Sequence, residues 1–166
     1  FKHRTFTADD LFYFLHFLQH HYCRHTSLET AFSKWLPAGA INIEPALVGF
    51  KRYFFEADHL RRTEKHIGSP EHGSACKRLN MFLRWMVRRD KAGVDFGIWK
   101  KIQPDQLVCP LDVHVARVAR RLQLLHRKQT DWQAALELTA SLKQFHAADP
   151  VQFDFALFGM GVVEKY

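Results

Sequence analysis

Apolar residues in this chain recur at the three- and four-residue spacing of an α-helix, and no stretch alternates apolar with polar residues as a half-buried strand does. The clearest apolar stripe lies between residues 76 and 88 and consists of Cys76, Leu79, Leu83 and Met86. No internal repeat is present. Because an amphipathic helix must bury its stripe against another element and no sheet is indicated, the sequence predicts an all-α fold.

Capping and breaking residues divide the chain into separate helices. The predicted helices cover 8–23, 27–35, 45–66, 73–89, 96–102, 113–122, 130–145 and 150–161. Asp95 is the expected cap of the 96–102 helix, and Thr130 with Gln133 forms an expected capping box. These helices account for most of the chain.

Composition limits the cellular setting and the partner. Lys and Arg outnumber Asp and Glu to give a net charge of +7, which favours an anionic partner such as DNA. No apolar run reaches membrane-spanning length, and the three cysteines, few and odd in number, suit a reducing compartment. We therefore expect a cytoplasmic, monomeric protein that binds DNA and no membrane.

One helix carries a spacing that zinc sites use. His16, His20 and Cys23 fall at i, i + 4 and i + 7, but the sequence offers no fourth ligand for them. The same spacing is typical of a solvated helix face, and this alternative is the more common one. We expect no metal and no cofactor.

Two helix starts carry the residues that point to chemistry. Lys77 follows Gly73-Ser74-Ala75-Cys76 in the first turn of one predicted helix, and Asp112 stands at the start of another. The partial positive charge of a helix N-terminus disfavours a protonated amine and favours an ionised carboxylate. A nucleophilic amine beside a charged carboxylate is what an imine-forming excision reaction requires. Helix capping alone would also explain Asp112, and ordinary solvation would explain Lys77.

The segment Pro110-Leu111-Asp112-Val113-His114-Val115-Ala116-Arg117-Val118 resembles the aspartate segment of helix-hairpin-helix DNA glycosylases. Gly73-Ser74-Ala75-Cys76-Lys77 is similar to the hairpin motif that places the lysine nucleophile in the bifunctional members. The whole chain also resembles an uncharacterised bacterial family of that superfamily, through stretches such as residues 77–88.

The resemblance implies a two-lobed helical fold with a cleft between the lobes. It divides the single domain 1–166 into a partial first lobe over 1–66, the hairpin, lysine helix and aspartate helix over 67–125, and C-terminal helices over 126–166. Phe1 is not an initiator Met, so we expect part of the first lobe to be missing.

By the same resemblance, Lys77 and Asp112 are the expected catalytic residues of a DNA base-excision enzyme that acts on a flipped, oxidised purine. The expected DNA contacts are Gly73, Ser74, Ala75, Cys76, Arg84, Arg88, His114 and Arg117. Arg84 and Arg88 enter this set because they share a polar helix face with Lys77 and Asn80.

The hairpin departs from the glycosylase pattern at Glu71, His72 and Ala75. A nucleic-acid-binding protein with a glycosylase-like fold and no catalysis is therefore the alternative. A helical protein-interaction domain that ignores DNA is a third interpretation.

Overall fold

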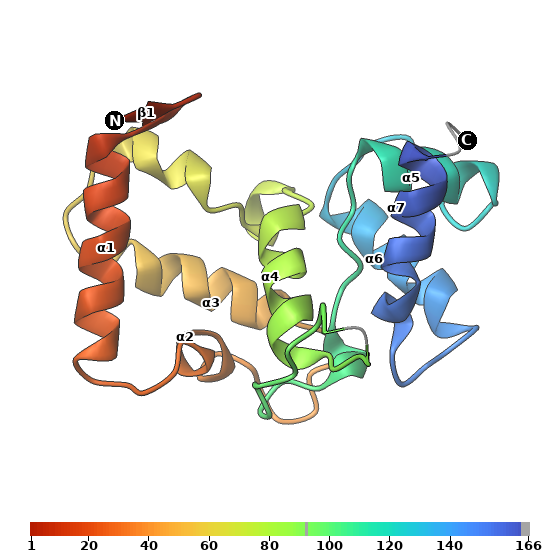
Figure 1. The fold of residues 1–166 in the computed structure, drawn as a ribbon, viewed down its shortest axis with the longest axis horizontal. Helices are drawn as coiled ribbons and strands as arrows, with labels where there is room; N and C mark the ends of the chain where they lie inside the picture. Colours follow the sequence, from red (N-terminus) through yellow and green to blue (C-terminus); the bar gives the residue numbers. More distant parts are fainter. Residues whose placement is uncertain (92, 164–166) are drawn as a thin grey trace.

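A computed structural model describes residues 1–91 and 93–163, and these are mainly helical (Figure 1). The α-helices are α1 (Ala8–Tyr22), α2 (Glu29–Ser33), α3 (Glu44–Phe54), α4 (Lys77–Val87), α5 (Val113–Arg121), α6 (Trp132–Lys143) and α7 (Asp154–Val162). Short 3₁₀ helices are η1 (Arg61–His66), η2 (Pro70–His72), η3 (Pro104–Gln106) and η4 (Pro150–Phe153). The last three residues of the predicted 126–166 segment lie outside the described residues.

A small hairpin modifies the all-α prediction. Strands β1 (Lys2–His3) and β2 (Phe6–Thr7) pair antiparallel at the start of the chain. The mainly helical class is confirmed. No helix within the described residues is long and apolar enough to cross a membrane.

Helix α4 lies at the centre of the molecule, with α1–α3 on one side and α5–α7 on the other (Figure 1). Its residue Leu83 is fully buried in a hydrophobic core that includes Phe32 and Leu47 from one side and Val118 and Leu138 from the other. Because α4 is covered on both sides, Asn80, Arg84 and Arg88 of its polar stripe are buried, whereas Lys77 at the start of the helix is exposed. In this arrangement the start of α4 lies next to the start of α5.

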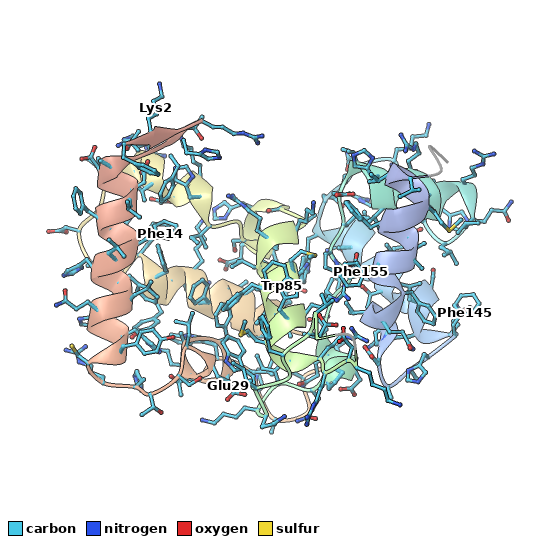
Figure 2. The ribbon with its side chains drawn as sticks, in the orientation of Figure 1. Lys2, Phe14, Glu29, Trp85, Phe145 and Phe155 are labelled. Carbon is cyan, nitrogen blue, oxygen red and sulfur yellow. The ribbon has the colours of Figure 1, made fainter. Side chains whose placement is uncertain are left out.

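Helix α1 packs against α3 through aromatic rings. The ring of Phe54 lies 4.3 Å from that of Phe17 and 4.7 Å from that of Phe14 (centroid distances), and Phe14 points from α1 towards α3 (Figure 2). The capping box of α1 joins Thr7 to Asp10, whose buried carboxylate also accepts a hydrogen bond from Thr63 in η1. These contacts hold η1 against the start of α1.

Three of the predictions about helices are wrong. The 45–66 helix ends at Phe54, and η1 forms separately because Arg62 turns back to pair with Asp9 and Asp10. Residues 96–102 form no helix, since the amides of Phe96 and Trp99 donate instead to carbonyl groups in α4. The cap of α6 is Asp131, whose carboxylate accepts from the Ala134 amide, and not the Thr130 box.

Candidate active site at the start of α4 and α5

The aspartate of the site is fixed by its own helix. Asp112 is the N-cap of α5, and its Oδ1 accepts hydrogen bonds from the backbone amides of His114 and Val115, each 2.9 Å long. These bonds satisfy two of the free amides at the helix start and set the side-chain rotamer. The second oxygen, Oδ2, is left to face α4.

Lys77 meets that second oxygen. Its Nζ donates to Oδ2 of Asp112 over 2.7 Å, although the two residues lie 35 positions apart. The Lys77 side chain is 45% exposed and that of Asp112 is 14% exposed, so the carboxylate is the more enclosed partner. Burial raises the pKa of Asp112, but the hydrogen bonds from Lys77, Val115 and His114 outweigh it and hold this pKa below the ordinary value. The site therefore holds an ionised carboxylate against an amine that solvent can reach.

A basic groove of about 600 Å³ opens on one side of Lys77. Lys65 and Arg78 line it together with Lys77 and His66, and none of the described residues that line it is acidic. Arg78 is held at the rim, since its Nη2 donates to the carbonyl oxygen of His66 over 3.1 Å. No side chain caps α4, so its first amides remain available beside the groove. An anion is the partner that this lining favours.

An apolar cavity of about 120 Å³ lies on the other side of the pair. Its lining residues are Lys77, Met81, Pro110, Asp112, Val115, Asp154, Phe155 and Phe158. Phe155 lies between α7 and α4 (Figure 2), and the Arg84 guanidinium carbon sits 3.9 Å from the centre of its ring. The Lys77–Asp112 pair thus stands where a polar groove meets an aromatic cavity.

The predicted phosphate loop, Gly73–Cys76, lies against the start of α6. Gly73 adopts φ 70°, and its carbonyl oxygen accepts from the Trp132 amide over 3.2 Å. Ser74 Oγ accepts from the Cys76 amide over 3.2 Å. Ser74, Ala75 and Cys76 line the basic groove, whereas Gly73 does not. Burial raises the pKa of the Cys76 thiol to about 11, so Cys76 stays neutral and contributes packing.

Arg84 and Arg88 are not on a solvated face, which corrects the sequence interpretation. Arg84 is 1% exposed and pairs with Asp154 through Nη1 at 2.5 Å and with Asp95 through Nη2 at 3.3 Å. Arg88 pairs with Asp149 through Nε at 2.7 Å and also with Asp95. Both guanidinium groups are engaged by carboxylates inside the molecule. We therefore leave them out of any DNA-contacting surface.

The two remaining candidates on α5 face α7. The His114 ring packs edge-on against Phe158, with centroids 6.3 Å apart. Arg117 is exposed, and its Nη2 donates to the carbonyl oxygen of Gly161 over 2.5 Å. Neither residue lines the basic groove or the apolar cavity.

The sequence interpretation missed lining residues on both sides of the pair, among them Lys65 and Arg78 in the groove and Phe155 and Phe158 in the cavity. Lys65 belongs to a basic run that is usually only solvated, and the two rings are indistinguishable in sequence from core aromatics. Only the fold places them beside Lys77.

The histidine spacing on α1 is not accompanied by a metal-binding cluster. Within the described residues, no group of three or more His, Cys, Asp or Glu side chains is arranged to hold a metal ion. His16 and His20 line a separate cavity, and Cys23 is exposed outside it.

Comparison with known proteins bears on the family alone. No curated protein and no solved structure matches the chain. Residues 1–163 match the model of one family, described as a protein of unknown function (DUF2400). Because this match covers nearly the whole sequence, the chain belongs to the DUF2400 family.

Proposed function

We propose that this protein is a DNA base-excision enzyme with a two-lobed, glycosylase-like fold, in which Lys77 is the nucleophile and Asp112 the assisting carboxylate. The observation that carries the proposal is the 2.7 Å contact between Lys77 Nζ and Asp112 Oδ2 at the junction of the groove and the cavity. A damaged base, with an oxidised purine as the example, is the substrate class that the family resemblance suggests.

The basic groove supports the placement of the DNA strand. Lys65, Lys77 and Arg78 line it, and none of the described residues in its lining is acidic, so a phosphate backbone would release counterions there and gain affinity. The free amides at the start of α4 would hold one phosphate next to Lys77. Ser74, Ala75 and Cys76 would lie along this path. The strand would thus pass within reach of the amine.

The apolar cavity supports extrusion of the base. An enzyme that breaks the bond between base and sugar must take the nucleotide out of the helical stack, and aromatic side chains commonly receive the flipped base. Phe155 and Phe158 supply such rings beside the Lys77–Asp112 pair. A base that stacked there would leave its C1′ atom at the mouth of the cavity, close to the amine.

The chemistry follows from the two side chains. Asp112 accepts one proton from the Lys77 ammonium, and the free amine attacks C1′ as the bond from C1′ to the base breaks. The base leaves with the electron pair and takes the second nitrogen proton. Asp112 then returns its proton to O4′ as the sugar ring opens, which leaves an iminium at Lys77 beside a charged carboxylate. The charged carboxylate of Asp112 then takes a proton from C2′ of this iminium, and the C3′–O bond breaks with its electron pair on the leaving 3′ phosphate, which cuts the strand.

Borohydride trapping tests the proposal, because it reduces the imine to a permanent bond between protein and DNA. We expect the wild-type protein to be trapped on duplexes that contain an oxidised purine or an abasic site. Lys77→Gln should abolish trapping while DNA binding persists, since Lys77 is substantially exposed and its loss leaves the core intact. Lys65→Gln is the matched control: it removes a lysine from the same groove and should still be trapped.

The other outcomes of the trapping experiment point to different mechanisms. Trapping of Lys77→Gln would move the nucleophile elsewhere. Excision by the wild type without trapping would indicate an activated water assisted by Asp112. The absence of both, across a panel of damaged bases, would favour a non-catalytic nucleic-acid-binding protein.

A further inference from the structure

A second cavity, the α1–α3 cavity, lies between α1 and the C-terminal end of α3. Its volume of about 300 Å³ is at the lower end of the range for small-molecule sites. The polar and aromatic lining residues available to contact a ligand are Tyr13, His16, His20, Arg24, Tyr53 and Glu56. None of them lines the basic groove or the apolar cavity, so this is a separate place in the molecule.

One helix face supplies the donors of the α1–α3 cavity. His16, His20 and Arg24 follow one another at four-residue intervals along one face of α1 and beyond its end. Arg24 Nη1 donates to Nε2 of His20 over 2.5 Å, since a guanidinium group can only donate. Within the described residues Arg24 has no carboxylate within ion-pair distance. Its remaining N–H groups are available to an anion.

The aromatic walls are held rigidly and have no hydroxyl proton to offer. His21 is fully buried, and its Nε2 lies 3.0 Å from the carbonyl oxygen of Ser27, so this nitrogen carries the proton. Its Nδ1 therefore accepts from the Tyr53 hydroxyl over 3.0 Å. The Tyr13 hydroxyl donates to the carbonyl oxygen of Phe54 over 2.8 Å. The Lys34 ammonium, which does not line the cavity, lies 3.5 Å from the centre of the Tyr53 ring and covers one of its faces, so the ring surface on the cavity side is the part offered for stacking.

An acceptor stands near the same wall. Glu56 is exposed and follows the end of α3, and no ion pair to it is formed within the described residues. Burial raises the pKa of Tyr53, Arg24 lowers it and Glu56 raises it, so both charges act on this ring. The cavity thus combines an aromatic wall with a guanidinium and a carboxylate that form no ion pair within the described residues.

We propose that the α1–α3 cavity binds one nucleotide unit, with its phosphate on Arg24, its base against Tyr53 and the N–H edge of the base on Glu56. Guanine suits this arrangement because its edge presents adjacent N–H donors that one carboxylate can accept together. The unit is either a free guanosine monophosphate or the phosphorylated end of a DNA strand, which share this chemistry. The proposal does not depend on catalysis at Lys77.

Isothermal titration of the protein with guanosine monophosphate tests the assignment. We expect binding that is about tenfold weaker for guanosine and for inorganic phosphate, because each lacks one half of the contacts. Arg24→Gln should weaken nucleotide binding by about tenfold, since it removes a charge-assisted contact. Arg89→Gln, which makes the same charge change on an exposed residue outside the cavity, should leave the affinity unchanged. Glu56→Gln should reduce the preference for guanosine over adenosine monophosphate.

A competition experiment with oligonucleotides shows whether the bound unit is a free nucleotide or the phosphorylated end of a strand. Displacement of guanosine monophosphate by a 5′-phosphorylated strand, and not by its unphosphorylated twin, would assign a strand end; displacement by neither would assign the free nucleotide. Lys77→Gln should bind the nucleotide as the wild type does. The proposal is overturned by no binding up to about 5 mM nucleotide, by equal affinity in Arg24→Gln, or by loss of binding in Lys77→Gln.

Discussion

At the scale of single residues, the two carboxylate oxygens of Asp112 have different partners. Oδ1 accepts from two amides of its own helix, and Oδ2 accepts from Lys77. The first set of bonds requires only an acceptor, whereas the second gains from negative charge. Capping and charge can therefore be separated by substitution at one position.

Asp112→Asn should keep the helix cap and remove the charge. Because Asn caps helices about as well as Asp, we expect little change in the midpoint of thermal unfolding. If the proposed function holds, excision should fall by roughly 10²- to 10³-fold, the size of effect seen when one electrostatic stabiliser is removed. Single-turnover excision and circular dichroism melting measure the two effects. Asp112→Ala, which also removes the cap, should cost about 1 kcal/mol of stability; an unchanged excision rate in Asp112→Asn would contradict the catalytic role.

At the scale of elements, buried ion pairs tie α4 to the start of α7. Arg84 joins Asp154 on α7 to Asp95 in the connection after α4, and Arg88 joins that connection to Asp149. Burial raises the pKa of Asp154 even though Arg84 opposes this shift. Asp154 also lines the apolar cavity, so this network fixes the wall on which Phe155 lies.

Arg84→Ala should therefore act on stability. It leaves the buried carboxylate of Asp154 without its cation and leaves Asp95 with Arg88 alone, and breaking a buried pair in this way costs about 3–5 kcal/mol. Urea unfolding measures the loss. The matched variant Arg78→Ala removes an exposed arginine from the same helix and should change stability by less than about 0.5 kcal/mol. Equal unfolding free energies for the two variants would contradict the buried network.

Two glycines of α7 differ in what surrounds them. A Cβ atom at Gly161 would lie 3.0 Å from the carbonyl oxygen of His114, whereas one at Gly159 would meet nothing within 4 Å. We expect Gly159→Ala to stabilise the protein by about 0.5–1 kcal/mol, because Ala favours the helix. Gly161→Ala should give no such gain, since α5 and α7 would have to move apart. Thermal unfolding compares them; greater stability of Gly161→Ala than of Gly159→Ala would show that this close approach is unimportant.

The sequence was sufficient to predict helices that are determined by local contacts. It was insufficient where residues distant in the sequence determine the local structure. Periodicity and caps predicted α1, α4 and α5 to within a few residues. The 45–66 helix failed because Arg62 pairs with side chains more than fifty residues earlier, and the 96–102 helix failed because Asp95 is drawn to Arg84 and Arg88. Helix propensity contains no information on such partners.

The same limit applies to the site. The juxtaposition of Lys77 and Asp112 was expected from the family resemblance, since two helix starts can only be brought together by the fold. The polar face of α4 gave a wrong expectation for Arg84 and Arg88, because periodicity shows which residues share a face and not what covers it. The groove residues Lys65 and Arg78 required the structure.

At the scale of the whole molecule, the basic side chains behind the net charge of +7 lie in different environments. Arg84 and Arg88 are neutralised inside the molecule, whereas Lys65, Lys77 and Arg78 line one groove that contains no acidic residue among those described. A long anion would therefore be attracted to this groove more than to the average surface. Helix α4 lies between the two groups of helices (Figure 1), and Lys77 at its start both lines the groove and pairs with Asp112.

Binding of duplex DNA should accordingly weaken steeply as salt concentration rises. Lys65→Gln and Arg78→Gln should each weaken binding to all sequences alike and reduce the slope of log K against log salt by about 1, since each removes one phosphate contact. Fluorescence anisotropy at several salt concentrations measures the slope. Arg89→Gln, an exposed arginine outside the groove, is the control and should leave the slope unchanged. Equal slopes for all three variants would move the DNA to another surface, and an affinity independent of salt would remove DNA as the partner.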